Sequence, residues 1–354
     1  MIDTIQKHSR KKKSEHKTLP SVDVIIPHFN GVEILDKCLA SLEKTRYANF
    51  LVTIVDNGTV DESIKLALEK YRSIRVISAG RNLGYAGGCN FGFRHTEGKY
   101  VIFLNNDTEQ EPDWIEHLVE VAESDERIAA LQPKLRSMQA KLRGEKVFDY
   151  AGAAGGMLDM LGYPYALGRV FNAVEPDHGQ YDESRDIFWA SGAAMMVRRK
   201  AIEQVGAFDD DFFAHMEEID LCWRLKIAGY RIVSVPKAVV YHYGGATLAA
   251  GNPRKIYLNH RNNLMMIIKN ASWSRLLWLL PVRVLLELAA LIYYQRYASE
   301  YVRYVWRALW WNVQHFIKNI AKRRAVQKTR TQSDRDIFKH SGGLVVLRKV
   351  LLGR

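Results

Sequence analysis

The chain has 354 residues, of which 47% are hydrophobic and 25% charged, and its formal net charge is +12. This composition is that of a globular protein with one large domain or two smaller ones. Its three cysteines, Cys38, Cys89 and Cys222, are widely spaced, which excludes a cysteine-based metal site and suits a reducing cytosol.

The basic excess lies at the two ends of the chain. Residues 1–20 carry six Lys or Arg against two acids, and residues 271–330 carry eleven against two, so residues 21–270 are slightly acidic. The first segment lacks the apolar core of a secretory signal and is predicted to be a disordered basic tail. Basic ends can contact nucleic acid or an anionic membrane, but no nucleic-acid-binding motif is present, so no nucleic acid partner is expected.

The N-terminal third alternates apolar strands with helical segments. The predicted strands are VDVIIPHFN (22–30), FLVTIVDNG (50–58), IRVISA (74–79) and KYVIFLNNDT (99–108). This alternation predicts an α/β architecture with a mostly parallel sheet covered by helices on both faces. Ligands of such sheets bind at the carboxyl ends of the strands, and three of these ends are polar here: His28/Asn30, Asp56/Asn57 and Asn105/Asn106/Asp107.

The middle of the chain is less regular. Residues 135–188 hold a Gly-rich patch and are interpreted as a substrate-side insertion. IFWASGAAMMVRRKAIEQVG (187–206) predicts a strand followed by a short helix, and RIVSVPKAVVYHYGG (231–245) predicts a final strand. Between them, HMEEIDLCWRL (215–225) places Glu217, Glu218 and Asp220 at the start of a half-buried helix.

Each polar candidate also has an ordinary structural explanation. Asp56 could form an Asx turn, and Asp107 could cap a turn. The three acids of residues 217–220 could stabilise the positive end of a helix dipole by ~0.3–1 kcal/mol per charge. A lone histidine such as His242 is more often structural than a ligand.

Taken together and in order, these motifs resemble glycosyltransferase family 2, the inverting enzymes of the GT-A fold. The stretches that carry the resemblance are VDVIIPHFN, VDNGTVDES, GRNLGYAGGCNFG, LNNDT, WASGAAMMVRR and MEEIDLCWRL, spread over roughly residues 21–250. NLGYAGGCN and MEEIDLCWR are most similar to the rhamnosyltransferase-like branch. The resemblance implies a nucleotide-diphosphate sugar donor and a Mg²⁺ or Mn²⁺ cofactor.

The resemblance also implies roles for single residues. Asp56 would bind the nucleotide base, and the loop from Pro27 to Asn30 would line the nucleotide site. Asn105 and Asp107 occupy the positions of the family's D-x-D metal motif, although the first aspartate is Asn here. The remaining nucleotide-side residues implied are Phe29, Asn57, Asn82, Gly84 and Asn106.

The same resemblance places the catalytic base at the start of the acidic helix. An inverting transfer needs a carboxylate within hydrogen-bond reach of the acceptor hydroxyl. Glu218 aligns with the family's base. Asp220 is the second candidate, and its alternative role is that of a structural partner for nearby backbone or for Arg224. His242 lies 24 residues after Glu218, where a family histidine can ligate the metal alongside Asp107.

The C-terminal third predicts long helices. Residues 276–294 are strongly apolar, interrupted by Pro281 and by Arg283 and Glu287, which could pair at i,i+4. Residues 293–324 mix Tyr and Trp with Arg and Lys, a composition typical of a helix in a membrane interface. Packing on the catalytic domain and a genuine span by 276–294 are the alternatives.

These observations predict five segments: a tail (1–20), a nucleotide-sugar-binding half (21–134), an acceptor-binding and catalytic half (135–250), an amphipathic membrane-associated region (251–330) and a C-terminal tail (331–354). The expected protein is cytoplasmic and peripheral on the inner face of the cell membrane.

The expected activity is transfer of one sugar, with L-rhamnose from dTDP-rhamnose as the leading donor, to a glycan or lipid-linked acceptor in cell-envelope polysaccharide synthesis. The alternatives are another donor such as a UDP-hexose, an inactive nucleotide-sugar-binding scaffold, and a nucleotidyltransferase. The last lacks a Gly-rich, Lys- or Arg-containing triphosphate loop after its first strand. A processive polymerase is disfavoured because the Q-x-x-R-W signature is absent.

Overall fold

The structure is a computed structural model that describes residues 19–170, 173–244 and 251–352. Most of the predicted N-terminal tail therefore lies outside the described residues. Of the tail, Leu19 and Pro20 are described, and their carbonyls accept hydrogen bonds from Asn49 and Tyr47.

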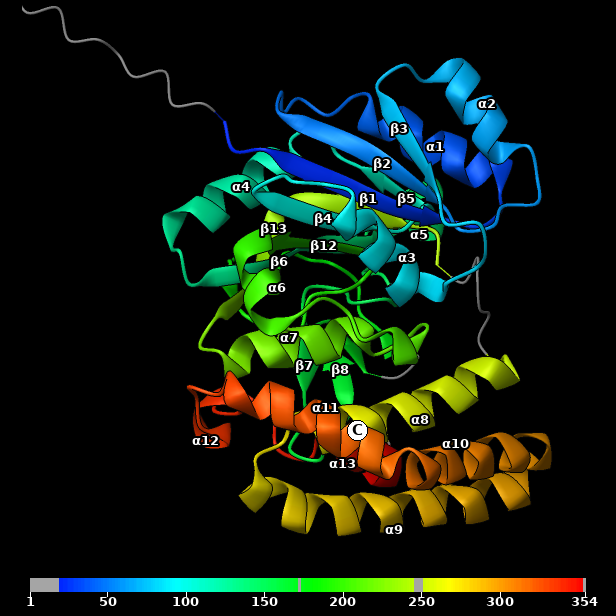
Figure 1. Cartoon of the computed structure of the whole chain (residues 1–354), viewed down its shortest axis with the longest axis vertical. Coiled ribbons are helices and arrows are strands. Elements are labelled where there is room, and N and C mark those ends of the chain that lie inside the picture. Colours follow the sequence, from blue (N-terminus) through cyan, green and yellow to red (C-terminus); the bar gives the residue numbers. More distant parts are fainter. Residues whose placement is uncertain (1–18, 171–172, 245–250, 353–354) are drawn as a thin grey trace, which may run out of the picture.

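Within the described residues, one sheet of nine strands forms the centre of the molecule (Figure 1). Its strand order is β11-β13-β6-β12-β4-β1-β2-β3, with β5 paired to β13. The strands are β1 (Val22–His28), β2 (Phe50–Asp56), β3 (Ile74–Ser78), β4 (Tyr100–Leu104), β5 (Thr108–Gln110), β6 (Ile128–Ser137), β11 (Arg185–Asp186), β12 (Ala194–Arg198) and β13 (Arg231–His242).

The half of the sheet built from β3, β2, β1 and β4 is parallel, as the alternation of strands and helices predicts. The other half is mixed. β12 runs antiparallel to both β4 and β6, while β13 is parallel to β6. The start of β12 and the ends of β4 and β13 consequently lie at the same edge as the ends of β1 and β2.

Helices cover both faces of the sheet (Figure 1). One face packs on α1 (Val32–Leu42), α2 (Ser63–Lys70) and α4 (Trp114–Ser124), and the other on α3 (Gly84–Arg94), α6 (Arg199–Val205) and α7 (Glu217–Ile227). The strands alternate their side chains between two apolar clusters. For example, Val24 and Ile26 of β1 face the first layer and Ile25 faces the second. This burial on both faces explains why β1 is a continuous apolar run.

The predicted insertion at 135–188 contains a small separate sheet in the order β10-β9-β8-β7. Its strands are β7 (Gly156–Leu158), β8 (Pro164–Ala166), β9 (Arg169–Val170) and β10 (Ala173–Val174), and the short helix α5 (Met138–Leu142) precedes them. In Figure 1, β7 and β8 lie below α7, between the main sheet and the C-terminal helices.

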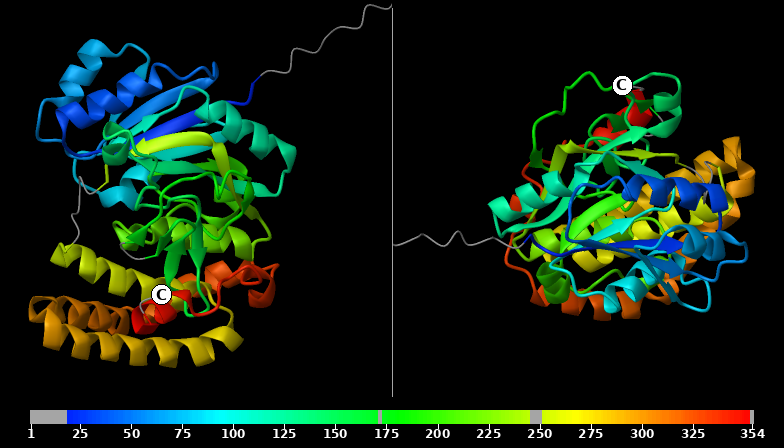
Figure 2. Two further views of the ribbon diagram at one scale, coloured as in Figure 1. Left: turned by 180° about the vertical axis from the view of Figure 1, so that it is seen from behind. Right: turned by 90° about the horizontal axis from the view of Figure 1, so that it is seen from above.

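The C-terminal helices form a further layer below α7, seen from both sides in Figures 1 and 2. α8 packs against α7, α9, α10 and α11, and α9 is the outermost helix in Figure 1. The elements are α8 (Pro253–Asn270), α9 (Trp273–Tyr297), α10 (Val302–Gln314), α11 (Phe316–Lys328), α12 (Asp334–Ile337) and α13 (Val345–Leu352), with short 3-10 helices at Asp210–Phe212 and Ser299–Tyr301.

The segment predicted as a C-terminal tail folds back onto the protein. Phe338, which follows α12, is buried against the rings of Phe188 and Trp223. This segment therefore packs into the same apolar cluster as Phe188 and Trp223 instead of extending from the protein.

Unlike an ordinary surface helix, α9 buries its charged side chains and exposes its apolar ones. Its charged residues Arg275, Arg283 and Glu287 are buried against the protein, and Arg283 pairs with Glu287 at 2.9 Å, as the i,i+4 spacing predicts. Its outward face is apolar and includes Leu277, Trp278, Val282, Val284, Leu285, Leu288, Ile292 and Tyr293. In the part of the chain that the structure describes, α9 is the one helix long and apolar enough to cross a membrane.

Candidate active site

The strand ends place the predicted site residues at one edge of the sheet. His28 pairs in register with Asp56, and β4, which ends at Leu104, lies on the other side of β1. The N–H of Asn105 bonds to the carbonyl of Ala193 at 3.0 Å, which joins the metal-motif loop to the turn before β12.

Asp56 ends β2 and is half-buried. Its carboxylate accepts hydrogen bonds from the N–H groups of Gly58 and Thr59 and from the hydroxyl of Ser78. Burial opposes the charge, but these bonds outweigh it and the pKa of Asp56 is lowered. The Asx-turn interpretation therefore describes the backbone here. It does not exclude a ligand, because a carboxylate has about four acceptor positions.

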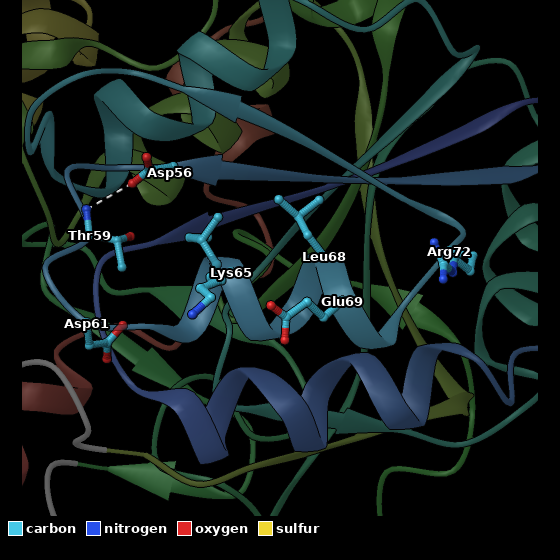
Figure 3. A pocket seen from close by; sticks show the side chains of 8 residues that line it. Asp56, Thr59, Asp61, Lys65, Leu68, Glu69 and Arg72 are labelled. Carbon is cyan, nitrogen blue, oxygen red and sulfur yellow. Dashed lines mark hydrogen bonds between the residues drawn. The ribbon is translucent and has the colours of Figure 1, made fainter.

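A depression of about 730 Å³ opens beside Asp56 and runs along α2 (Figure 3). Asp56, Thr59 and Asp61 gather at one end of it and Arg72 lies at the other (Figure 3). Asp107, His242 and Glu218 are not among its lining residues, so the depression adjoins the side of the edge predicted to bind the nucleotide and not the side with the candidate metal ligands.

The end of β1 and the loop after it hold three of the predicted nucleotide-side residues. Pro27 is half-buried against α3, where Gly88 leaves no room for a side chain, since a Cβ there would lie 3.0 Å from Pro27. Phe29 and Asn30 are exposed at the loop's tip. The loop is secured by Asp61, which accepts from the N–H of Gly31 at 2.7 Å and was not predicted from the sequence.

His28 and Asn106 meet at the base of this loop. The Asn106 amide lies 2.8 Å from Nδ1 of His28, whose Nε2 lies 2.7 Å from the Ser63 hydroxyl. Burial lowers the pKa of His28 to about 4, so the ring is neutral and serves as a hydrogen-bonded link. Asn106 is thereby linked to the loop after β1.

The side chain of Asn57 is also hydrogen-bonded to the protein's own backbone. Its buried amide accepts from the N–H of Leu83 at 2.9 Å and donates to the carbonyl of Gly84 at 3.0 Å. The exposed Asn82 accepts from the N–H of Gly84. Asn57 therefore shapes the loop whose predicted nucleotide contacts are Asn82 and Gly84.

Gly84 is needed for close packing of this loop. Its φ is +74°, and a Cβ would lie 2.5 Å from the carbonyl oxygen of Phe213. The N–H of Ala86 donates to that same carbonyl at 3.2 Å. The nucleotide-side loop and the segment just before α7 are thus in direct contact, a link that no local sequence pattern indicates.

Asp107 and His242 face each other at the ends of β4 and β13. Oδ1 of Asp107 lies 3.1 Å from Nε2 of His242, and the Asn105 amide lies 3.4 Å from the same nitrogen. Burial alone would raise the pKa of Asp107, but His242 outweighs it and the pKa is lowered. Burial opposes the charge of His242, yet Asp149 and Asp107 raise its pKa to about 10.

Asp149 is a site residue that sequence reasoning missed. It lies in the Gly-rich insertion, is buried, and contacts Nδ1 of His242 at 2.8 Å. A carboxylate on one ring nitrogen leaves the other facing Asp107, which is the arrangement of histidines that ligate metals. Asp149 has no spacing relation to His242 that a sequence could reveal.

These residues fit a divalent cation. Oδ1 of Asp107 is buried and makes no hydrogen bond within the described residues, although it lies beside His242. Neighbouring ligands of an octahedral ion at ~2.1 Å lie about 3 Å apart, close to the observed separation. In the described chain, no three His, Cys, Asp or Glu side chains are arranged to hold a metal ion by themselves. An ion bound by Asp107 and His242 would therefore need further ligands, such as substrate phosphates.

Glu217 and Glu218 begin α7 and differ in their surroundings. Glu217 is buried near Tyr85 and Cys89, whereas Glu218 is partly exposed beside the backbone of Gly192. One oxygen of each is buried without a hydrogen-bond partner among the described residues. Burial raises the pKa of Glu218 to about 7, with backbone N–H groups opposing the rise. Burial, followed by the neighbouring Glu218, raises the pKa of Glu217 well above its usual range.

Asp220, the second candidate base, points away from this edge. It is fully buried and contacts Arg224 at 2.9 Å, Lys269 at 3.0 Å and the amide of Asn270 at 2.9 Å. Burial would raise its pKa, but Lys269 and Arg224 keep it lowered. A carboxylate so enclosed cannot reach an acceptor hydroxyl, so Asp220 is a structural ion-pair partner, not a base.

Comparison of the sequence with known families gives a match over much of the chain. Residues 23–206 match the family Glycosyl transferase family 2. An N-acetylglucosaminyl-diphospho-decaprenol L-rhamnosyltransferase of Mycobacterium tuberculosis is 27% identical over 261 residues, 70% of this chain and 83% of its own. The O-antigen biosynthesis protein RfbC of Myxococcus xanthus is 26% identical over 235 residues, 65% of this chain but 18% of its own.

Solved structures show the same fold at low sequence identity. The mannosyltransferase PcManGT from Pyrobaculum calidifontis, in complex with GDP-Man and Mn²⁺, superposes with a TM-score of 0.51 and 14% identity, covering 88% of this chain and 86% of its own. GalNAc-T7 with UDP, GalNAc and Mn²⁺ gives 0.55 and 15%, covering 72% of this chain and 48% of its own. With the family match spanning more than half of its residues, this chain belongs to glycosyl transferase family 2, in the rhamnosyltransferase-like branch, and has the GT-A fold.

Proposed function

We propose that this protein transfers a single sugar with inversion, with L-rhamnose from dTDP-rhamnose as the leading donor, to a lipid-linked saccharide at the inner face of the cell membrane. The observation that carries the proposal is the gathering of Asp56, the Asp107–His242 pair and Glu218 around one sheet edge, connected by the contacts of Asn105 with Ala193 and of Gly84 with Phe213.

Glu218 is suited to act as the base. Its carboxyl is partly exposed, and its pKa of about 7 lets it hold or release a proton near neutrality. It would take the proton of the acceptor hydroxyl while that oxygen forms the new bond to the anomeric carbon and the nucleoside diphosphate leaves. Inversion follows because a single displacement occurs on the face opposite the leaving group.

Asp107 and His242 would hold Mg²⁺ or Mn²⁺, with Asn105 beside them. When bound, the cation would neutralise the negative charge that develops on the departing diphosphate. Asp149 would keep His242 oriented through its Nδ1. The Mn²⁺ in the related structures supports a divalent metal without deciding between the two ions.

The rhamnose donor and lipid-linked acceptor rest on the relatives. The Mycobacterium tuberculosis protein is named for rhamnosyl transfer to an N-acetylglucosaminyl-diphospho-lipid and is similar over most of both chains. Other similar proteins are named for poly-N-acetylglucosamine synthesis, so a UDP-hexose donor remains the second candidate.

Association with the membrane is supported by the inverted polarity of α9. α10 and α11 add exposed apolar side chains at Trp306, Trp310, Val313 and Ile317, which are all more than half exposed. Exposed cations flank these side chains at Arg303, Arg307, Lys318 and Arg324. Rings and aliphatic groups beside cations match an anionic lipid surface. A span by α9 is disfavoured because it would move Arg283 and Glu287 away from their buried partners.

A donor panel tests the proposal. dTDP-rhamnose, UDP-glucose, UDP-N-acetylglucosamine and a nucleoside triphosphate are compared for binding and turnover, each with Mn²⁺ and with EDTA. We expect one nucleotide sugar to bind in a Mn²⁺-dependent manner and Asp107→Asn to remove that dependence with at least a tenfold weaker Kd. Binding of the triphosphate alone would favour a nucleotidyltransferase, and binding without any turnover would favour an inactive scaffold.

A further inference from the structure

The segment before α7 has an unusual backbone. Phe213, His215 and Met216 have φ values of +63°, +68° and +73°, and Ala153 is the one other non-glycine residue with positive φ in the described chain. Side chains rarely adopt this conformation, which persists only where the surroundings enforce it. We call residues 211–216 the base loop, because it leads directly into the helix that starts with Glu217 and Glu218.

Two adjacent side chains of α8 hold the base loop. Arg261 donates from Nη2 to the carbonyls of Asp211 (2.7 Å) and Phe212 (2.9 Å). Asn262 places its amide nitrogen within 3.1 Å of Phe212, 3.0 Å of Ala214 and 2.7 Å of His215 carbonyl oxygens. The carbonyls of the loop thus converge on α8.

Arg261 also fixes the orientation of the Asn262 side-chain amide. Nε of Arg261 donates to Oδ1 of Asn262 at 2.8 Å, which directs the amide nitrogen toward the loop. Both side chains are more than nine-tenths buried, so water does not compete for these bonds. Arg261 and Asn262 therefore act as one unit.

The opposite side of the base loop touches the nucleotide-side loop. The Phe213 carbonyl accepts from Ala86 at 3.2 Å and lies where a side chain on Gly84 would be. Only Glu217 lies between Met216, the last residue of the base loop, and Glu218. A shift of the base loop would therefore displace both the base and the loop predicted to contact the donor.

We propose that Arg261 and Asn262 are positioning residues for the transfer reaction: by holding the base loop in its strained conformation they set Glu218 against the bound donor. The inference rests on the proposed function and adds residues outside the matched segment 23–206 to its machinery.

The main test compares two neighbouring asparagines in the full-length protein. Asn262→Ala removes the amide from the base loop. Asn263→Ala removes an equally buried amide, which donates to the carbonyl of Gly162 at 2.8 Å in the insertion instead. Turnover, donor KM, the pH profile of kcat and Tm are measured with dTDP-rhamnose or whichever nucleotide sugar the wild type uses.

We expect Asn262→Ala to lower kcat about 100-fold, the scale of loss for a misplaced catalytic group. The acid limb of its pH profile should move below pH 7, since a released base loop exposes Glu218 to water. Asn263→Ala should keep kcat within about threefold and leave the acid limb in place. A merely structural role predicts similar loss of Tm in both variants with no change in the acid limb.

Arg261→Lys provides the second arm. It keeps the positive charge and one donor nitrogen but loses the second nitrogen of the fork, which serves Asn262 in addition to the two carbonyls. A smaller loss of kcat, about tenfold, is therefore expected with the same direction of pH shift. If Asn262→Ala does not fold, Arg261→Lys is judged alone by these criteria. Unchanged kcat and acid limb in the folded variants would overturn the inference while the proposed function stands. A wild type without transferase activity would overturn both.

Discussion

At the scale of single residues, Glu217 and Glu218 show how one peptide bond separates two different carboxyl groups. Glu218 is partly exposed at the sheet edge, whereas Glu217 points into the protein beside Tyr85 and Cys89. Successive helix positions differ by about 100°, so the two acids cannot serve the same site. Because burial raises the pKa of Glu217 well above its usual range, the folded protein holds this proton to a higher pH than the unfolded chain does.

Glu217→Gln should therefore stabilise the protein in a pH-dependent way. Because the folded pKa is raised, the contribution of Glu217 to stability is fully present below its unfolded pKa and is lost as the pH rises. Gln resembles the protonated acid and does not ionise. We expect a Tm at least about 2 °C above wild type at pH 8, the shift expected from ~1 kcal/mol in a large domain.

At pH 4.5 the Tm of the variant and of the wild type should coincide. Differential scanning calorimetry at the two pH values measures this, and turnover should stay near the wild-type level. A variant destabilised at pH 8 would show that Glu217 is ionised in the folded protein and needs its charge.

At the scale of elements, hydropathy predicts the apolar length of α9 but not which of its faces packs on the protein. The apolar run and the Arg283–Glu287 pair were readable in the sequence, but the direction of each face was not. Composition does not reveal that the charged stripe packs on the protein while the apolar stripe faces outward. The buried contacts of Arg283 with the Leu161 carbonyl and of Glu287 with His260 on α8 establish that orientation.

Charges on the outer face of α9 should abolish membrane binding. Leu277, Leu285 and Ile292 are 74%, 65% and 73% exposed, so replacing all three by Glu leaves the core intact. Since a buried leucine contributes about 1.5–3 kcal/mol, vesicle affinity should fall by at least 100-fold. Co-sedimentation with phosphatidylglycerol-containing vesicles measures this, and Leu142→Glu, at a 75% exposed position in α5, is the control.

Equal sedimentation of the triple variant and the control would contradict the membrane proposal. A wild type that forms dimers and ignores vesicles would indicate that α9 meets a second copy instead. Deleting residues 271–354 is a poorer experiment, because Lys322 and Arg323 of α11 bind Asp209 and the carbonyl of Ile268, and the remainder would lose these contacts.

At the scale of the whole molecule, the sheet and its polar edge were predictable, and the parts that complete the site were not. Alternating periods and polar strand ends predicted β1, β2 and β4 with Asp56 and Asp107 at their ends. Antiparallel β12 resembles any other short apolar strand in sequence. Asp149 and the Arg261–Asn262 pair act across 93 and about 50 residues, where no local period operates.

Contacts with residues distant in the chain also explain why Asp220 and Asn57 have other roles in the structure than the sequence predicted. Asp220 has the same local context as Glu218, and its exclusion as a base comes from Lys269 and Asn270 on α8. Asn57 follows Asp56 directly, but the loop of Leu83 and Gly84 occupies its amide. In each case a partner from another element decides what the side chain does.

The most direct test of the central claim is paired measurement of donor affinity and turnover in Glu218→Gln. A base contributes roughly 10²–10⁴-fold to rate, and the amide keeps the size of the carboxyl without its proton affinity. We predict that kcat falls by at least 100-fold while the Kd for the nucleotide sugar with Mn²⁺ stays within about threefold. Turnover close to wild type, or a loss of donor binding equal to the loss of rate, would contradict the account.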